Sequence, residues 1–365
     1  MRIALAGGGT GGHAYPAIAV AEQLRALGGP GLELAYYGTQ HGAEHAIADR
    51  EGIPFRAIPA SPIRVRKPVA LAKGLLRLWQ GTRAARRLLE QERPGAVFAT
   101  GGYAAAPVGR AAKQAGIPLV VFLPDAYPGW AVKFLARYAT TIACAVDASV
   151  KEFPAGRAVV TGYPLRAQFA EATRDEGQRR FGLDPALPTI LVAGGSLGAR
   201  TINDAVLASL TDWLRVAQVV HIAGRADIER LRDATAGLSD DQRGRYHLYD
   251  YTEEMAYAMA AADIAVMRAG ASTLGELAVT GLPVVAIPGA FSDQAANAEY
   301  LATRGAAIHL PQAAIADLGA LILALIEDDD RRAQMRERMR ALARPDAARH
   351  LAEMVLDLAG RRTAA

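Results

Sequence analysis

Cysteine is almost absent from this sequence, since Cys144 is the only one among 365 residues. A single cysteine excludes a disulfide within the chain and is typical of a protein kept in a reducing cytoplasm. Long apolar runs are also missing: no stretch of about 18 uncharged apolar residues occurs, so we expect no membrane-spanning helix. The first residues lack the basic and then apolar pattern of a secretory leader, and we expect none. The length favours about two domains.

Acidic residues are absent from residues 61–89, although the whole chain has 37 of them. This segment accounts for the formal net charge of +4, because the rest of the chain holds 33 basic against 37 acidic side chains. Such a concentration of positive charge predicts a surface for an anionic partner. The eight basic residues of the segment are Arg64, Arg66, Lys67, Lys73, Arg77, Arg83, Arg86 and Arg87.

Apolar side chains are interleaved with these basic ones. Ile63 and Val65 alternate with arginines in a predicted loop, and Leu76 and Trp79 lie beside further arginines on the helix predicted to follow. This pattern suits the headgroup region of an anionic membrane. Arginine-rich helices also bind nucleic acid, and many are solvated faces with no partner. The residues predicted to contact a membrane are Ile63, Arg64, Arg66, Lys67, Leu76, Trp79, Arg83 and Arg87.

Short apolar runs alternate with helical stretches along the chain, which predicts α/β architecture with parallel sheets and crossover helices. We expect strands at 2–6, 32–37, 96–100, 119–123, 141–146, 189–193, 218–223, 246–250, 264–267, 284–287 and 306–310. We expect helices at 16–27, 69–91, 107–115, 129–138, 201–214, 273–280, 294–304, 312–327, 330–343 and 346–359. A strand–glycine–helix unit opens each half, so the simplest interpretation is two doubly wound domains with a cleft between their glycine loops.

The first glycine loop, Gly7–Gly12, is followed directly by His13. Glycines let backbone N–H groups approach an anion closely, and the helix that follows adds its positive N-terminal end. The loop has no lysine after its glycines, which disfavours a nucleoside triphosphatase. No acidic residue closes the second strand, which disfavours dinucleotide binding. His13 is either a helix-capping or core histidine or a proton-transfer group, and its place in the loop favours the latter.

A second set of polar residues, Arg268–Glu276, lies at a predicted strand end and helix start. A carboxylate at Glu276 is well placed to accept hydrogen bonds from a ribose, while loop N–H groups face phosphate. The alternative is a capping box in which Glu276 pairs with Ser272 or Thr273. Gln294 and Asn297 follow the next strand and can bind sugar hydroxyls or form a polar helix start.

Two apparent metal motifs favour other interpretations. His41 and His45 have helical spacing but no third ligand, and Asp328–Asp330 lies between a helix end and basic residues. We expect a surface pair and a solvated cap.

Taken together, these motifs resemble the MurG family of UDP-N-acetylglucosamine:N-acetylmuramoyl-(pentapeptide)-pyrophosphoryl-undecaprenol N-acetylglucosaminyltransferases. The resemblance runs from residue 1 to about 345. It implies the GT-B architecture, which is two Rossmann-like domains facing across a cleft. We expect an N-terminal acceptor and membrane-facing domain at 1–163, a C-terminal UDP-sugar-binding domain at 164–344, and a helix at 345–365 packing back on the first. The motifs are Gly8–His13, Gly38-Thr39 with Glu44, Gly101–Tyr103, Gly194–Ala199 with Asn203, Arg268–Glu276, Gly281–Pro283 and Gln294–Ala298.

The resemblance also implies roles for single residues. Thr10, Gly11 and Gly12 would line the diphosphate end of the cleft, and His13 would be the general base. Within the donor site, Thr252 would lie beside the uracil, Glu276 would bind the ribose and Gln294 would contact the sugar. The other residues expected to bind the donor are Arg166, Ser196, Arg268, Ala271, Ser272, Thr273, Leu274 and Gly275. Residues 63–87 would dock on the cytoplasmic face of an anionic inner membrane as a peripheral protein.

Two departures from the family pattern affect the site. Asp125 replaces an asparagine associated with the donor sugar, which makes it a second candidate base, and Leu197 replaces the usual glutamine of the second glycine loop.

The implied reaction is an inverting transfer of N-acetylglucosamine from its UDP donor to the C4 hydroxyl of undecaprenyl-linked lipid I, which gives lipid II. We expect no metal or other cofactor and no nucleic acid partner; proteins of cell-wall synthesis are further expected partners. The alternatives are a GT-B enzyme for another lipid or small-molecule acceptor, a UDP-N-acetylglucosamine 2-epimerase, and a nucleotide-binding module without catalysis.

Overall fold

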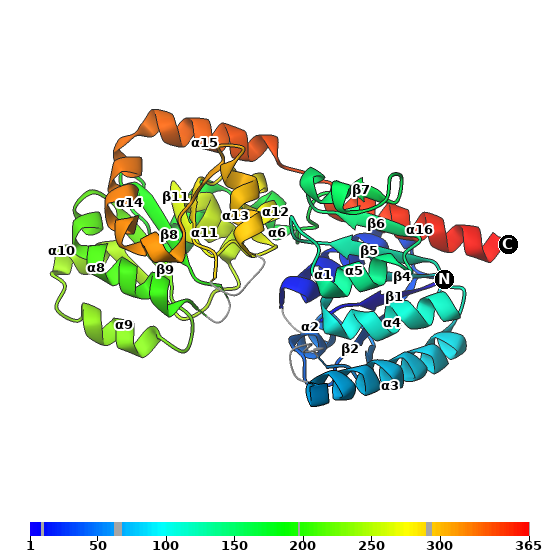
Figure 1. The fold of residues 1–365 in the computed structure, drawn as a ribbon. Helices are drawn as coiled ribbons and strands as arrows, with labels where there is room; N and C mark the ends of the chain where they lie inside the picture. The colour runs from blue at the N-terminus through cyan, green and yellow to red at the C-terminus, as the bar shows by residue number, and fades with distance from the viewer. Residues whose placement is uncertain (9–10, 62–67, 196–197, 290–293, 365) are drawn as a thin grey trace. The chain divides into compact units, whose positions relative to one another are not determined.

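The computed structural model describes residues 1–8, 11–61, 68–195, 198–289 and 294–364 of the chain (Figure 1). The chain forms two compact units. Unit 1 holds Met1–Arg166 and Arg344–Ala365, and unit 2 holds Ala167–Ala343. The boundaries expected from the sequence are 163/164 and 344/345.

Unit 1 is built on a parallel sheet whose described strands have the order β3-β2-β1-β4-β5-β6-β7. The chain starts in the middle of the sheet, moves to one edge and then returns to build the other. All five residues of β5 are buried, as expected for a parallel strand covered on both faces. The strands are β1 (Arg2–Ala6), β2 (Glu33–Gly38), β3 (Phe55–Ala57), β4 (Ala96–Ala99), β5 (Leu119–Leu123), β6 (Thr141–Cys144) and β7 (Ala158–Val160).

Helices cover both faces of this sheet (Figure 1). On one face α3, α4 and α5 pack side by side, and Leu89, Val108 and Leu135 bury their side chains against the strands. On the other face α1 packs against α2 and the C-terminal helix α16. The helices are α1 (Gly11–Gly28), α2 (Ala43–Arg50), α3 (Pro68–Glu92), α4 (Gly102–Gln114), α5 (Trp130–Ala136), the 3-10 helix η1 (Asp147–Glu152) and α16 (Ala347–Ala364).

Unit 2 has a parallel sheet whose described strands have the order β10-β9-β8-β11-β12-β13. Its strands are β8 (Thr189–Ala193), β9 (Gln218–Ile222), β10 (Tyr246–Tyr249), β11 (Ile264–Met267), β12 (Val284–Ala286) and β13 (Ala307–His309). Its helices are α6 (Gln168–Glu171), α7 (Arg174–Phe181), α8 (Arg200–Val216), α9 (Ile228–Thr235), α10 (Asp240–Arg245), α11 (Met255–Ala261), α12 (Thr273–Thr280), α13 (Gln294–Ala302), η2 (Gln312–Asp317), α14 (Leu318–Glu327) and α15 (Asp329–Ala341).

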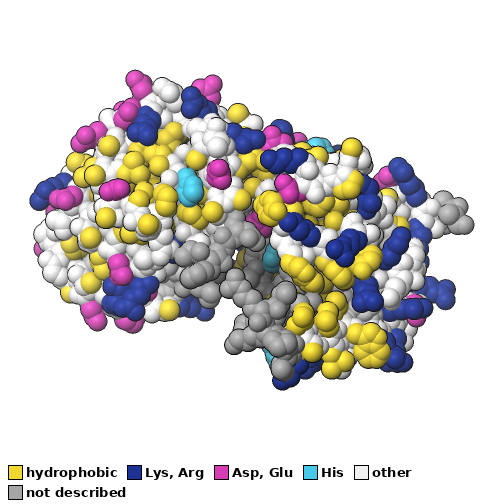
Figure 2. Space-filling view, viewed as in Figure 1, with side chains coloured by type: hydrophobic (Ala, Val, Ile, Leu, Met, Phe, Trp, Pro, Cys, Tyr) yellow, Lys and Arg dark blue, Asp and Glu magenta, His cyan; other side chains and the backbone are white. Residues whose placement is uncertain are grey.

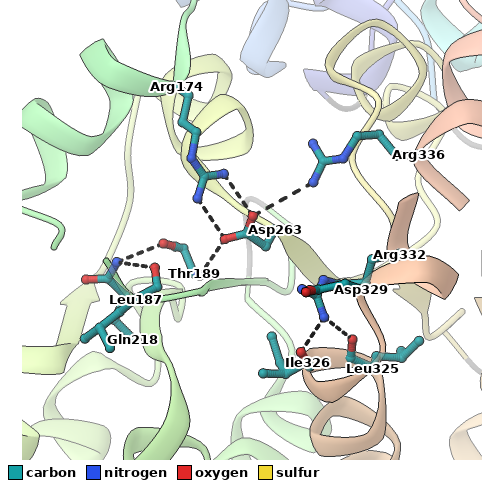
Figure 3. A network of polar contacts seen from close by, with 10 residues as sticks. All are labelled: Arg174, Leu187, Thr189, Gln218, Asp263, Leu325, Ile326, Asp329, Arg332 and Arg336. Atoms are coloured by element: carbon teal, nitrogen blue, oxygen red, sulfur yellow. Dashed lines mark hydrogen bonds and ion pairs between the residues drawn. The ribbon is translucent and has the colours of Figure 1, made fainter. Parts of the chain in front are cut away.

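Ion pairs and hydrogen bonds fasten the strand starts of unit 2 (Figure 3). Arg174 donates two hydrogen bonds to the carboxylate of Asp263, at 2.9 and 3.0 Å, and the backbone N–H of Thr189 donates a third at 2.9 Å. Arg336 of α15 approaches the same carboxylate at 3.9 Å. A bidentate arginine–carboxylate pair is geometrically specific, so it ties α7 to β8 and β11 at the edge of the sheet opposite the glycine loop.

The sequence predicts most of the strands and the longer helices, but it misses several short elements and places two helix starts too late. The missed helices are α2, α6, α7, α9, α10, α11 and η1. Strands β3 and β7 are missed as well; each has three residues and lies at an edge of the sheet. Helices α1 and α4 begin at Gly11 and Gly102, not at the expected residues 16 and 107. Pro16 and Pro107 lie inside these helices, although proline favours the first turn.

Candidate active site

His13 lies in the first turn of α1, just after the glycine loop that leaves β1. Its ring nitrogen Nδ1 is 3.0 Å from the backbone carbonyl oxygen of Thr100, at the end of the neighbouring strand β4. A carbonyl oxygen only accepts hydrogen bonds, so Nδ1 must carry a proton. The neutral imidazole then has its lone pair on Nε2, which is the form that a general base requires.

Thr100 also holds the backbone of His13. Its hydroxyl donates to the carbonyl oxygen of His13 at 2.5 Å, and its own N–H donates to the carbonyl oxygen of Ala6 at 2.9 Å. One threonine therefore ties the ends of β1 and β4 to the first turn of α1. Thr100 is not among the site residues predicted from the sequence, although a threonine between a buried strand and Gly101-Gly102 is the pattern that marks it.

The turn at Gly101-Gly102, which follows β4, packs against the first glycine loop. Gly101 and Gly102 have φ angles of +91° and +73°, and a Cβ atom on Gly102 would lie 1.9 Å from the carbonyl oxygen of Gly8. A Cβ atom on Gly101 would lie 3.5 Å from the ring of His13. The positive φ angles favour glycine at both positions, and the close approach to Gly8 leaves no room for a side chain at residue 102. The turn also forms a wall of the His13 site.

The buried carboxylate of Glu44 packs against Gly8 of the first glycine loop. Its Oε1 atom accepts hydrogen bonds from the backbone N–H of Thr39 at 2.9 Å and from the hydroxyl of Thr39 at 2.7 Å. A Cβ atom on Gly8 or Gly42 would lie 2.3 Å or less from the carboxylate. The hydroxyl of Tyr36 lies nearby, and burial together with the Glu44 charge raises its pKa. From the sequence, Glu44 is expected only as a residue of a family motif.

Asp125 lies in the turn after β5, at the same edge of the sheet as His13. The hydroxyl of Ser149 donates to the backbone carbonyls of Asp125 and Ala126, at 3.0 and 3.1 Å, and fixes this turn. β4 lies between β1 and β5, so the two strands that lead to His13 and Asp125 are about 10 Å apart.

Arg166 closes unit 1 beside the start of α1. Its guanidinium lies 4.9 Å from the centre of the Tyr15 ring, and the hydroxyl of Tyr163 donates to the carbonyl oxygen of Gly12 at 3.3 Å. The structure thus brings Arg166, Gly12 and His13 to one region of unit 1.

In unit 2, the buried side chain of Asn203 holds the loop that follows β9. Its amide donates to the Ala223 carbonyl oxygen at 3.0 Å and to Asp227 at 2.8 Å. The Asn203 carbonyl lies 3.0 Å from Nε2 of His221, whose Nδ1 is 2.9 Å from the Tyr246 hydroxyl. Burial lowers the pKa of His221 to about 3, so this histidine is neutral and structural.

The Arg268–Glu276 cassette lies at the end of β11, beside the end of β12. Arg268 donates to the carbonyl oxygens of Ile287 and Pro288, at 3.1 and 3.0 Å, and to Gln312. Its guanidinium therefore holds the loop after β12, and burial lowers its pKa. These contacts point to a positioning role for Arg268.

The capping-box alternative for the same cassette is wrong. The side chain of Ser272, the N-cap residue of α12, makes no capping hydrogen bond to the backbone. Ser272 instead donates to the carboxylate of Glu276 at 3.1 Å, and Thr273 donates to the carbonyl oxygen of Gly270. Ala271, Gly275 and Glu276 are half-buried, whereas Leu274 is buried in the core. The carboxylate of Glu276 is thus oriented by Ser272, without serving as a cap.

Three further predicted residues of unit 2 lie in or beside loops. The amide oxygen of Gln294 accepts a hydrogen bond from the N–H of Gly289 at 2.9 Å, and buried Asn297 donates to the carbonyl oxygen of Ala269 at 3.1 Å. The hydroxyl of Thr252 accepts from the N–H of Glu254 at 3.0 Å. Asn297 therefore connects α13 to the cassette.

Some predicted residues lie outside the described part of the chain. These are Thr10, Ile63, Arg64, Arg66, Lys67, Ser196 and Leu197.

The chain matches the models of the Glycosyltransferase family 28 N-terminal domain over residues 3–144 and C-terminal domain over residues 189–351. A protein of Roseiflexus sp. strain RS-1 is 40% identical over all of this chain and 97% of its own length. Its name is UDP-N-acetylglucosamine--N-acetylmuramyl-(pentapeptide) pyrophosphoryl-undecaprenol N-acetylglucosamine transferase. A relative of the same name from Salinibacter ruber is 39% identical over 98% of this chain and 97% of its own. The crystal structure of Acinetobacter baumannii MurG covers 98% of this chain and 99% of its own, with 29% identity and a TM-score of 0.77.

The chain belongs to the MurG family.

This membership explains why two doubly wound parallel sheets of the GT-B class occur in one chain, as the sequence predicts. Most of the MurG-family motifs in the described residues follow a strand or begin a helix, whereas Gly281–Pro283 lies between the end of α12 and the start of β12. A UDP-N-acetylglucosamine 2-epimerase from Neisseria meningitidis has the same fold at a TM-score of 0.69 and 13% identity, which is similarity of fold alone.

Proposed function

We propose that this protein is an inverting glycosyltransferase that moves N-acetylglucosamine from UDP-N-acetylglucosamine to the C4 hydroxyl of the muramoyl residue of lipid I. Lipid I is the N-acetylmuramyl-(pentapeptide)-pyrophosphoryl-undecaprenol acceptor, and the product is lipid II of peptidoglycan synthesis. The observation that carries this conclusion is full-length similarity, at up to 40% identity, to relatives named for this transfer.

In the proposed step, Nε2 of His13 takes the proton of the acceptor hydroxyl. The hydroxyl oxygen forms a bond to C1 of N-acetylglucosamine while the bond from C1 to the UDP oxygen breaks, so the configuration at C1 inverts. The Thr100 carbonyl oxygen supports this role because it holds the proton on Nδ1 and stabilises the imidazolium that forms. We assign the base to His13 because this contact fixes the tautomer that leaves the lone pair of Nε2 available.

We further propose that the donor is bound mainly by unit 2. Glu276, oriented by Ser272, accepts hydrogen bonds from the ribose, and Gln294 contacts the sugar. The backbone N–H groups at the N-terminal end of α12 stabilise the departing diphosphate. These donors can stabilise negative charge without a metal ion. No group of three or more His, Cys, Asp or Glu side chains suited to a metal occurs within the described residues.

We propose that unit 1 docks on the cytoplasmic face of an anionic membrane through α3 and α5. Leu76 and Trp79 on α3 are each 53% exposed, Trp130 on α5 is 47% exposed, and Arg83 lies over the Trp79 ring. Hydrophobic side chains gather with Lys and Arg over the face that carries α3, α4 and α5 (Figure 2). No helix among the described residues is both long and apolar enough to cross a bilayer.

The test measures UDP release from UDP-N-acetylglucosamine with and without a lipid I analogue. Release that requires the analogue is expected. Release without any acceptor would instead indicate an epimerase, release with an unrelated lipid acceptor would indicate another GT-B transferase, and no release at all would indicate a binding module.

Two variants separate the candidate bases. We expect His13→Ala to lower kcat by about 10²- to 10⁴-fold, with KM for UDP-N-acetylglucosamine nearly unchanged. We expect Asp125→Asn to have a smaller effect. Near-full turnover by His13→Ala would overturn the assignment, and a silent Asp125→Asn change would remove Asp125 as a candidate.

A further inference from the structure

A pocket of about 560 Å³ lies in unit 1 at the carboxyl ends of β2 and β3. This volume is typical of sites that bind small molecules. The walls come from the segments that follow the two strands, from α3, and from Tyr103, which follows Gly101-Gly102. The lining residues are Thr39, Gln40, His41, Ala57, Ile58, Pro59, Ala60, Ser61, Arg77 and Tyr103.

None of the described residues that line this pocket is acidic. Arg77 and His41 make no ion pair or hydrogen bond with any described residue, whereas Arg86 on the same helix is paired with Glu90. An unpaired guanidinium at the wall of a pocket is well suited to a carboxylate or a phosphate. Hydroxyls of Ser61 and Tyr103 and the amide of Gln40 add hydrogen-bonding groups of the kind that orient a ligand.

The pocket adjoins the His13 site through two connections. Tyr103 directly follows Gly101 and Gly102, which form the wall beside the His13 ring. On the opposite side, the Thr39 hydroxyl binds Glu44, and Glu44 packs against Gly8. A ligand in the pocket would therefore lie beside an acceptor whose hydroxyl reaches His13.

Arg77 also differs from the arginines of the proposed membrane surface. It is one residue from Leu76, which is about 100° round the helix. Arg83 and Arg87 lie close to the Leu76 direction, so the membrane-facing stripe and the pocket wall are different faces of α3.

We propose that this pocket binds the peptide of the acceptor, with Arg77 pairing with a peptide carboxylate. This inference rests on the proposed function, because the acceptor carries a pentapeptide. Two other sources of anionic groups exist, which are the acceptor's diphosphate and lipid headgroups. The pocket favours the peptide because it combines one cationic group with several hydrogen-bonding groups and with the apolar residues Ile58 and Pro59.

The first experiment measures direct binding of the free pentapeptide to the full-length protein, in detergent-free solution and without donor. The same peptide with every carboxylate converted to an amide is the second ligand. Wild type should bind the acidic peptide about tenfold more tightly than the amide. Arg77→Gln should remove this difference, and the control Arg86→Gln should keep it.

The second experiment compares lipid I analogues with short tails, in the absence of vesicles. Arg77→Gln should raise KM about tenfold for the analogue with free carboxylates and leave KM nearly unchanged for the amide analogue. An equal rise for both analogues would mean that Arg77 contacts the diphosphate. A rise seen only when anionic vesicles are added would mean that it contacts headgroups. Either result would overturn the peptide assignment.

The two proposals can fail separately. Equal binding of both peptides to wild type would overturn the pocket assignment even if transfer to lipid I is observed. Arg77-dependent peptide binding without any acceptor-dependent UDP release would support the pocket and overturn the proposed reaction.

Discussion

His13 owes its tautomer to a residue far away in the sequence. Thr100 is 87 positions later, but it lies at the end of the neighbouring strand and contacts both the ring and the backbone of His13. At the scale of the single residue, the candidate catalytic group is therefore set by its neighbours as much as by its own chemistry.

The contact between Gly102 and Gly8 can be tested by a substitution that adds one methyl group. Gly102→Ala places a Cβ 1.9 Å from the Gly8 carbonyl oxygen, so the loop beside His13 must shift. We expect kcat to fall tenfold or more. Gly116→Ala is the matched control, because Gly116 has a similar φ of +64° but no atom within 4 Å of its Cβ. The positive φ angle should cost each variant about 1–2 kcal/mol of stability, and the overlap with Gly8 should cost Gly102→Ala more. Equal kcat values for the two variants would contradict the role of the contact.

The neutral buried His221 predicts a pH dependence of stability in unit 2. Burial lowers its pKa to about 3, against an ordinary value of 6.5. Between these values the unfolded chain binds a proton that the folded chain does not, so stability is complete above pH 6.5 and is lost as the pH falls. The slope is up to about 1.4 kcal/mol per pH unit.

Denaturant unfolding of the full chain at pH 7.5 and pH 5.5 measures this effect. Fluorescence of buried Trp213 reports on unit 2 when Trp79 and Trp130 are replaced by Phe. His221→Gln should flatten the pH dependence, whereas His350→Gln, at an exposed position of unit 1, should not. An unchanged slope in His221→Gln would assign the pH dependence to other groups.

At the scale of the element, α1 shows how a helix contains an internal proline. Pro16 has no N–H to donate to the carbonyl oxygen of Gly12, four residues earlier. The hydroxyl of Tyr163 donates to that oxygen instead. The helix can therefore begin at Gly11 and include His13 in its first turn, which local sequence preferences did not predict.

The proposed membrane surface on α3 predicts a loss of vesicle binding without a loss of folding. Leu76→Ser and Trp79→Ser remove side chains that are half-exposed, and each should weaken binding to anionic vesicles about tenfold or more. Arg83→Gln and Arg87→Gln should each weaken it by about 1 kcal/mol, in a salt-dependent way. Val216→Ser, an exposed apolar position in unit 2, is the control for sedimentation with vesicles. Unchanged binding of the α3 variants would exclude this surface.

At the scale of the whole molecule, the chain ends in the unit where it began. The match to the C-terminal family domain continues to residue 351, but residues 344–365 belong to unit 1. α16 packs against α1 and β4, with Leu351 and Val355 fully buried. The Arg362 side chain also donates to the carbonyl oxygen of Pro94 at 2.7 Å.

Removal of α16 should therefore destabilise unit 1. The buried Leu351 and Val355 alone account for about 1.5–3 kcal/mol each, against a total stability of about 5–15 kcal/mol for a domain. Truncation after Ala343 should abolish the unfolding transition of unit 1 in calorimetry and leave that of unit 2. Truncation after Arg362 should leave both transitions in place. A retained unit 1 transition in the shorter chain would contradict the packing described.

The sequence by itself predicts the two α/β units, most strands and the glycine loops, and it singles out His13 and Glu276 as candidate site residues. These features depend on local patterns of apolar, glycine and polar residues, which survive in a single sequence. It does not predict β3 and β7, the early starts of α1 and α4, or the contacts that replace the expected capping box.

The remaining features depend on residues that are distant in the chain and adjacent in the sheet. The tautomer of His13 requires Thr100, the support of its loop requires Glu44, and the proposed peptide pocket combines Thr39, Arg77 and Tyr103. Parallel strands joined by crossover helices bring such residues together at one edge of a sheet. Local pattern thus determined which groups the chain offers for chemistry, and only the tertiary structure decided which of them meet.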